Sequence, residues 1–122
     1  MAIRRGDIKP VALPQESITV DAIGGEVIVR GMDMPQLLDF LDRRRLLMQP
    51  GEGEAPDVAE TRAGHVLIPH VLHTSVLADD LQPVYTQEQW RAFGAAHVAD
   101  ALALFNMAMR LSGSDVQAEK KS

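Results

Sequence analysis

Residues 83–113 read PVYTQEQWRAFGAAHVADALALFNMAMRLSG, and their pattern predicts two consecutive helices. Thr86, followed three residues later by Gln89, forms a capping box, in which both side chains bond free backbone amides at the start of a helix. Gly94 is expected to separate a short first helix from a longer second helix over residues 95–112. The last third of the chain is therefore expected to be helical.

The longer helix carries apolar side chains on two opposite faces when its residues are placed about 100° apart. One face gathers Val98, Leu102, Phe105 and Met109, and the opposite face gathers Leu104, Met107 and Leu111. A single small core needs only one such face, so two interpretations stay open. Either the domain encloses the helix on both sides, or the second face docks against a partner. Methionine favours docking, because its flexible thioether adapts to partners of irregular shape.

The N-terminal half begins with a predicted β-hairpin. Apolar and polar residues alternate over residues 18–22, a β-branched run follows over residues 27–29, and Gly24-Gly25 between them suits a tight turn. Asp33 with Gln36 then forms another capping box and predicts a helix. The apolar stripe of this helix is expected to cover the hairpin and consists of Leu37, Phe40, Leu41, Leu47 and Met48.

The run Arg43-Arg44-Arg45 could bind phosphates, but the charges around it favour a solvated helix face. Asp39 precedes Arg43 by four residues and Asp42 precedes Arg45 by three, the spacings at which helical side chains form ion pairs. The chain has 17 acidic and 12 basic side chains, and its formal net charge is -5. Because nucleic acids are bound through concentrated positive surface, this balance argues against a nucleic-acid partner.

Residues 49–64 are rich in Pro, Gly and acidic side chains and are expected to form a mobile acidic loop. Residues 66–77 then have the apolar spacing of a short buried helix, with a strand as the alternative. Pro69 fits that helix only in its first turn. Asp79-Asp80 predicts a turn. The expected fold class is α+β and mainly helical, with an N-terminal β-hairpin followed by about four helices.

Length and composition predict one domain. A chain of 122 residues forms a single core, which we place over residues 17–113, with a flexible N-terminal arm over residues 1–16 and a disordered tail over residues 114–122. The chain lacks cysteine, so disulfides and thiolate sites are excluded. Its first residues show no secretory signal, and it has no apolar run of about 18 residues that could cross a bilayer. We therefore expect a cytoplasmic protein without a membrane partner.

Patterns that would indicate catalysis are weak. His70 and His73 share a helical face and could be drawn as a metal site, but such pairs without a carboxylate in register are usually ordinary side chains. Ser75 lacks the flanking glycines of a nucleophile elbow. Gly24-Gly25 is followed by a strand and no lysine, unlike a phosphate-binding loop. The sequence thus predicts no catalytic residue, no cofactor and no metal site, and it indicates a non-enzymatic protein.

The order of these parts resembles the tail assembly chaperones of long-tailed bacteriophages over about residues 17–113. The resemblance includes the Gly-Gly hairpin continuing into Glu26-Val27-Ile28-Val29-Arg30, the capped helix, the acidic loop and the apolar segment ending in Val76-Leu77-Ala78-Asp79-Asp80. It also includes Pro83-Val84-Tyr85-Thr86 and a last helix closing on Leu111-Ser112-Gly113. Family members often carry a glycine in the turn where this chain has Leu81-Gln82.

The resemblance implies a non-enzymatic protein made in an infected or lysogenic bacterial cell. Such a chaperone binds the tape measure protein, keeps that long and sticky helical chain from aggregating, helps to recruit tail tube subunits and leaves before the tail is finished. It would act in the bacterial host cytoplasm and is not expected in the mature virion. Family members tend to self-associate, so a homo-oligomer is also compatible with the resemblance.

We expect the partner-binding residues to lie on the second face of the long helix and beside it. They are Leu104, Met107 and Leu111, together with Trp90 and Phe93, and they would contact the client or a second copy. Two other functions stay open. One is a structural tail component such as a terminator or connector subunit, and the other is a small metal-dependent enzyme built on His70 and His73.

Overall fold

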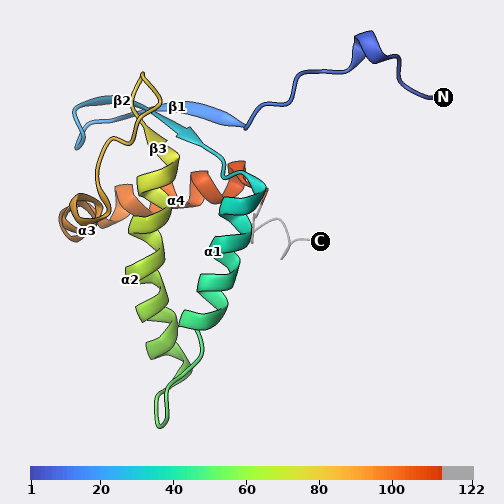
Figure 1. The fold of residues 1–122 in the computed structure, drawn as a ribbon. Coiled ribbons are helices and arrows are strands. Elements are labelled where there is room, and N and C mark those ends of the chain that lie inside the picture. Colours follow the sequence, from blue (N-terminus) through green and yellow to red (C-terminus); the bar gives the residue numbers. More distant parts are fainter. Residues whose placement is uncertain (114–122) are drawn as a thin grey trace.

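The structure, a computed structural model, describes residues 1–113 and has the expected α+β, mainly helical class (Figure 1). A three-stranded antiparallel sheet lies across one end of the helices. The elements in chain order are the 3-10 turn η1 (Arg5–Asp7), β1 (Gln15–Val20), β2 (Gly25–Arg30), α1 (Met34–Leu47), α2 (Pro56–Ser75), β3 (Val76–Leu77), α3 (Gln87–Ala96) and α4 (Val98–Leu111). The tail expected over residues 114–122 lies outside the described residues.

The predicted hairpin is confirmed as β1 and β2. Ile18 pairs with Val27 and Val20 pairs with Gly25, which fixes the register of the two strands. Gly24 has φ 106, a conformation that favours glycine because it has no Cβ. β2 is the central strand, since Ile28 also pairs with a residue of β3. The strand alternative for the segment before Asp79 therefore holds only for the two residues of β3.

The predicted capping box before α1 is present, but this helix covers another helix rather than the hairpin. Gln36 donates its backbone N–H to Asp33 Oδ1 over 2.8 Å, and Gln36 Oε1 accepts from the Asp33 amide over 3.0 Å. α1 packs mainly along α2, and its buried Phe40 lies 6.3 Å from the ring of Phe105 on α4. Leu41, expected in the buried stripe, is 42% exposed.

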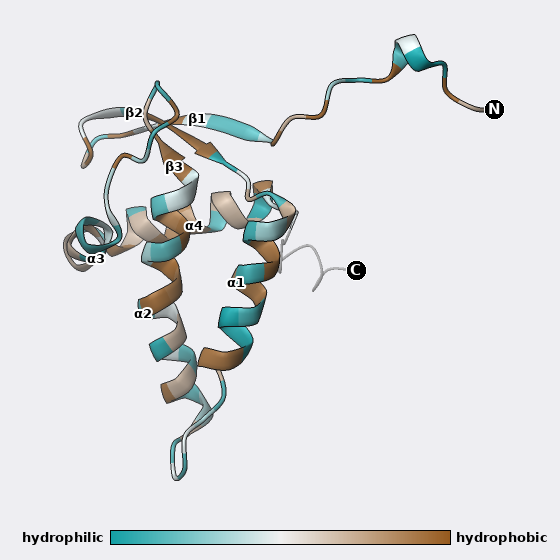
Figure 2. Ribbon diagram, in the orientation of Figure 1, coloured by the Kyte–Doolittle hydropathy of each residue, from teal (hydrophilic) through white to brown (hydrophobic). Residues whose placement is uncertain are grey.

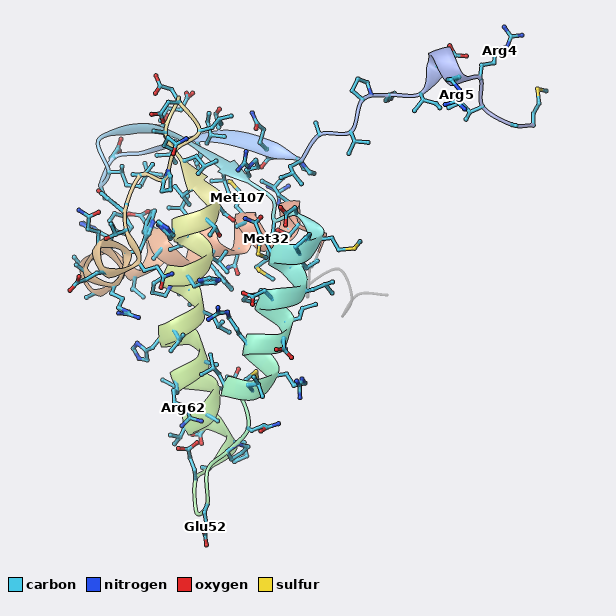
Figure 3. All side chains as sticks on the ribbon, viewed as in Figure 1. Arg4, Arg5, Met32, Glu52, Arg62 and Met107 are labelled. Carbon is cyan, nitrogen blue, oxygen red and sulfur yellow. The ribbon has the colours of Figure 1, made fainter. Side chains whose placement is uncertain are left out.

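The expected loop over residues 49–64 is too long, because α2 already begins at Pro56 and runs for 20 residues. Proline suits this first helical position, where its missing N–H would have no partner anyway. The Arg62 guanidinium stabilises the shorter connection, because it donates two hydrogen bonds of 2.8 Å to the Glu54 carboxylate and one to the Leu47 carbonyl. Figure 3 shows Glu52 at the tip of this connection, below Arg62.

Pro69 lies inside α2 and not in a first turn as expected. A proline within a helix cannot donate to the carbonyl four residues earlier, here that of His65. After α2 and β3 comes the predicted turn at Asp79-Asp80, followed by Leu81 at φ 62. This left-handed conformation is one that glycine adopts without strain and that a leucine side chain rarely adopts.

The capping box of Thr86 and Gln89 is also present and starts α3. The break between the last two helices falls at His97 rather than at Gly94, because the backbone leaves helical geometry there with φ -135 and ψ 63. Gly94 lies within α3 close to α4, and a Cβ placed on it would be 3.8 Å from the Ala101 Cβ.

One continuous core joins the inner face of the sheet to the helices. In Figure 2 hydrophobic segments concentrate on β2, β3 and the middle of α2. The core comprises Val20, Val27, Val29, Met32, Phe40, Ala63, Leu67, Val71, Leu72, Val76, Trp90, Phe93, Ala101, Leu104 and Ala108.

The end of α4 is held against the junction of β2 and α1. The Met32 amide donates to Ser112 Oγ over 2.8 Å, and a Cβ added to Gly31 would come within 2.5 Å of the Leu111 carbonyl oxygen. Glycine at position 31 is thus what allows the two backbones to approach this closely. Residues 1–12 extend away from the rest of the described chain, and Figure 3 places Arg4 and Arg5 far from the helices.

Candidate functional site

Much of the expected partner-binding face belongs to the core. Trp90 is 1% exposed, Phe93 8% and Leu104 1%, while Met107 and Leu111 are partly buried against the same core. Trp90, Phe93 and Leu104 are therefore not on a free face, whereas Met107 and Leu111 keep part of their surface exposed. α4 packs against α2, α3 and β2, and Leu104, which was assigned to a partner-binding face, belongs to the core.

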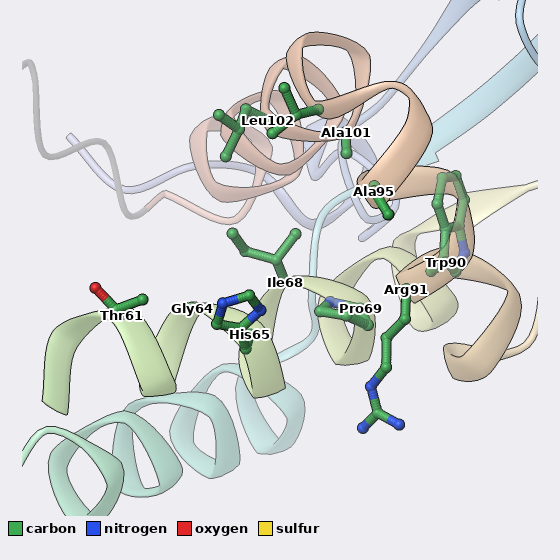
Figure 4. Close-up of a pocket in the computed structure, with 12 residues that line it drawn as sticks. Thr61, Gly64, His65, Ile68, Pro69, Trp90, Arg91, Ala95, Ala101 and Leu102 are labelled. Carbon is green, nitrogen blue, oxygen red and sulfur yellow. The ribbon is translucent and has the colours of Figure 1, made fainter. Parts of the chain in front are cut away.

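The apolar surface that α4 leaves open is the N-terminal part of its other face, whereas Phe105 and Met109 of that face pack against the core as expected. Val98 is 61% exposed and Leu102 is 43% exposed, although both were expected in the core. They border a groove of about 440 Å³ between α2, α3 and α4 (Figure 4). Its lining residues are Thr61, Gly64, His65, Ile68, Pro69, Trp90, Arg91, Gly94, Ala95, Val98, Ala101 and Leu102.

Each of the three helices contributes one regular stripe to the groove. The α2 stripe is Thr61, Gly64, His65 and Ile68, whose spacing of three, one and three residues keeps them on one helical face. The glycines and alanines of the lining leave room between the helices, and the larger side chains of Ile68, Val98 and Leu102 provide its apolar walls. Figure 4 shows Ile68 and Leu102 on opposite sides of the groove.

His65 and Arg91 are the ionisable side chains that line the groove, and both are exposed. Among residues 1–113, no hydrogen bond or ion pair is found for the Arg91 guanidinium. The His65 carbonyl also lacks its usual helical donor because position 69 is proline. The groove thus combines apolar walls with a basic rim, on a chain whose net charge is -5.

His70 and His73, the two histidines considered for metal binding, contact neighbouring polar groups of the protein. His73 Nδ1 lies 2.9 Å from the Tyr85 carbonyl oxygen. His70 Nε2 lies 3.7 Å from Asp39 Oδ2, and its Nδ1 lies 3.2 Å from Gln87 Nε2. Burial and, secondarily, the nearby Arg43 guanidinium lower the pKa of His70, against the opposing effect of Asp39.

Within the described part of the chain, no group of three or more His, Cys, Asp or Glu side chains is placed to hold a metal ion. Ser75 is 1% exposed. Among the described residues, the groove between α2, α3 and α4 and a shallower hollow beside it on α2 leave room for another molecule.

Sequence reasoning missed the groove for two reasons. The predicted loop ended at residue 64, which removed Thr61 and Gly64 from any helical stripe, and Val98 and Leu102 were assigned to the core. A usable signal was present, since Thr61, Gly64, His65 and Ile68 have helical spacing once α2 is extended to Pro56.

No protein-family model matches the chain, and neither a curated protein nor a solved structure matches it. Within residues 1–113 no helix has both the length and the apolar character needed to span a membrane.

Proposed function

We propose that this protein is a non-enzymatic chaperone of bacteriophage tail assembly that binds the tape measure protein. The observation that carries the proposal is the open groove between α2, α3 and α4, which leaves apolar side chains such as Val98 and Leu102 uncovered. Exposed apolar patches rimmed by polar groups are typical of protein-binding surfaces. A holder for exposed apolar helices needs such a surface.

The charge of the chain also supports a holding role. A net charge of -5 on a small domain favours solubility, so a complex with a sticky client would be kept from aggregating by its acidic component. The resemblance to tail assembly chaperones supplies the identity of the client and a second task, the recruitment of tail tube subunits. In this proposal the protein acts in the cytoplasm of the bacterial host and leaves before the virion is complete.

The proposal is tested by expressing the tape measure protein encoded by the same phage or prophage with and without this chain. We expect the client to be soluble and to co-purify with the chain when both are made, and to aggregate when it is made alone. A client that aggregates equally in both cases would refute the holding function.

Purified phage particles distinguish a chaperone from the structural alternative. Quantitative mass spectrometry of tails should detect the tape measure protein but not this chain. A fixed, ring-sized copy number in finished particles would instead identify a terminator or connector subunit.

A further inference from the structure

We infer that the groove between α2, α3 and α4 binds one amphipathic helix of the partner, with carboxylate side chains beside the helix's apolar face. This inference rests on the proposed function in taking a protein as the occupant. It adds the binding site and the chemistry of the segment that is bound.

The dimensions of the groove suit a short helical segment. Its α2 wall runs from Thr61 to Pro69, about 12 Å at 1.5 Å per residue, or roughly two helical turns. An amphipathic helix bound in a groove of that length presents apolar side chains at i, i+3, i+4 and i+7. Small residues at 64, 94, 95 and 101 allow these side chains to enter deeply, because little side-chain volume lies between the walls.

The charged side chains that line the groove determine which side chains are favoured beside the apolar face of the partner helix. The groove is lined by no Asp or Glu side chain, whereas Arg91 and His65 lie on it. Arg91 carries a charge opposite in sign to the net charge of the chain, which has five more acidic than basic side chains. Carboxylates beside the partner's apolar face would therefore be attracted, and lysine or arginine in the same places would be repelled.

A second copy of this chain is a poorer occupant. The exposed apolar stripe best suited to enter the groove is on α1, where Met34, Leu38 and Leu41 follow each other at i, i+4 and i+7. Arg45 falls on the same face of α1, within about 20° of Met34. Arg45 is ion-paired with Asp42 at 2.7 Å, so docking that stripe would bring no free carboxylate to Arg91, and the groove gains no charge complementarity from a second copy.

Two helical peptides of equal apolar content test the inference directly. Both carry leucine at i, i+3, i+4 and i+7, and they differ only in having glutamate or lysine on either side of the leucines. We expect the glutamate peptide to bind the full chain about tenfold more tightly at low salt in fluorescence anisotropy, and the preference to shrink at high salt. Replacement Arg91→Glu should reverse the preference.

Three variants locate the binding site. Leu102→Asp places a charge on an exposed groove wall, and Gly64→Leu fills the groove from a position where an added Cβ has ordinary space. Each should weaken binding of the glutamate peptide at least about tenfold, whereas Leu38→Asp on α1 is the matched control and should leave it unchanged. Circular dichroism and thermal melts establish that each variant is folded, and Leu102→Asp is informative even if Gly64→Leu does not fold.

Several outcomes would overturn the inference. These are equal affinity for both peptides at low salt, unchanged binding by folded Leu102→Asp, or an equal loss with Leu38→Asp. Self-association of the wild type that both Leu38→Asp and Leu102→Asp abolish would show that a second copy fills the groove. If the peptides bind but the tape measure protein is not held, the proposed function fails and the groove assignment stands. If Leu102→Asp still holds the tape measure protein, the function stands and the groove assignment fails.

Discussion

Replacement Gly31→Ala, just after β2, should destabilise the domain much more than Gly25→Ala at the start of the same strand. The added Cβ would lie 2.5 Å from the Leu111 carbonyl oxygen and 2.8 Å from the Leu111 carbonyl carbon. Both are backbone atoms, so they cannot rotate away as the end of a long side chain can. Relief requires the end of α4 to move away from the junction of β2 and α1.

The size of the effect follows from three contributions. Overpacking in a dense region costs about 1–3 kcal/mol. Moving α4 also weakens the hydrogen bond from the Met32 amide to Ser112 Oγ, a loss of about 1 kcal/mol. Alanine reduces the conformational freedom of the unfolded chain and returns about 0.4–1 kcal/mol. The free energy of unfolding should therefore fall by about 2 kcal/mol, which corresponds to a melting temperature lower by about 6–12 °C.

Urea unfolding followed by far-ultraviolet circular dichroism measures the change, with thermal melts as a second readout. Gly25→Ala is the matched control, because a Cβ at position 25 meets nothing within 4 Å and its backbone does not require glycine. We expect this control to lie within about 0.5 kcal/mol of the wild type. Equal stability of Gly31→Ala and Gly25→Ala would refute the close approach of α4 to residue 31.

Three further predictions concern other parts of the domain. Leu104→Ala should lower the free energy of unfolding by about 2–5 kcal/mol and Leu102→Ala by much less, because Leu104 is 1% exposed and Leu102 is 43% exposed. If urea titrations gave the same loss of stability for both variants, the orientation of α4 would be contradicted. Leu81→Gly should raise stability by about 1 kcal/mol, since it relieves the left-handed strain at φ 62, and a lower melting temperature would count against that strain. In the folded protein the pKa of His70 lies below its ordinary value of 6.5, so the unfolded chain binds the proton more readily. The free energy of unfolding should therefore fall as the pH drops through 6.5 towards the folded-state pKa. His70→Gln should flatten this part of the profile of stability against pH, and an unchanged slope would rule out His70 as its source.

The elements that were predicted well are those with local causes. Asp33 with Gln36 and Thr86 with Gln89 satisfy backbone amides within four residues, so their effect does not depend on the rest of the fold. The ion pair of Asp39 with Arg43, at 2.7 Å, is likewise decided within one helix. The hairpin was predictable because its turn glycines and β-branched residues lie side by side in the sequence.

The elements that were predicted poorly depend on contacts between distant segments. Pro69 normally ends or begins a helix, yet here it lies among the buried residues of a 20-residue helix that packs against α1, α3 and α4. On α4 both faces are apolar, so periodicity could not decide whether Leu104 or Leu102 points inward. The groove was missed for the same reason, because Val98 and Leu102 in its lining were assigned to the core.

The hydrogen bond between the Met32 amide and Ser112 Oγ has a consequence for synthesis on the ribosome. The two residues are 80 positions apart, so a ribosome that adds about 5–20 residues per second needs about 4–16 s to reach Ser112 after it has added Met32. During that interval the nascent chain has a hairpin whose inner residues, including Val29, have no α4 to cover them. Domain closure must therefore be a late event in translation, and half-made chains need protection from one another until the last helix has emerged.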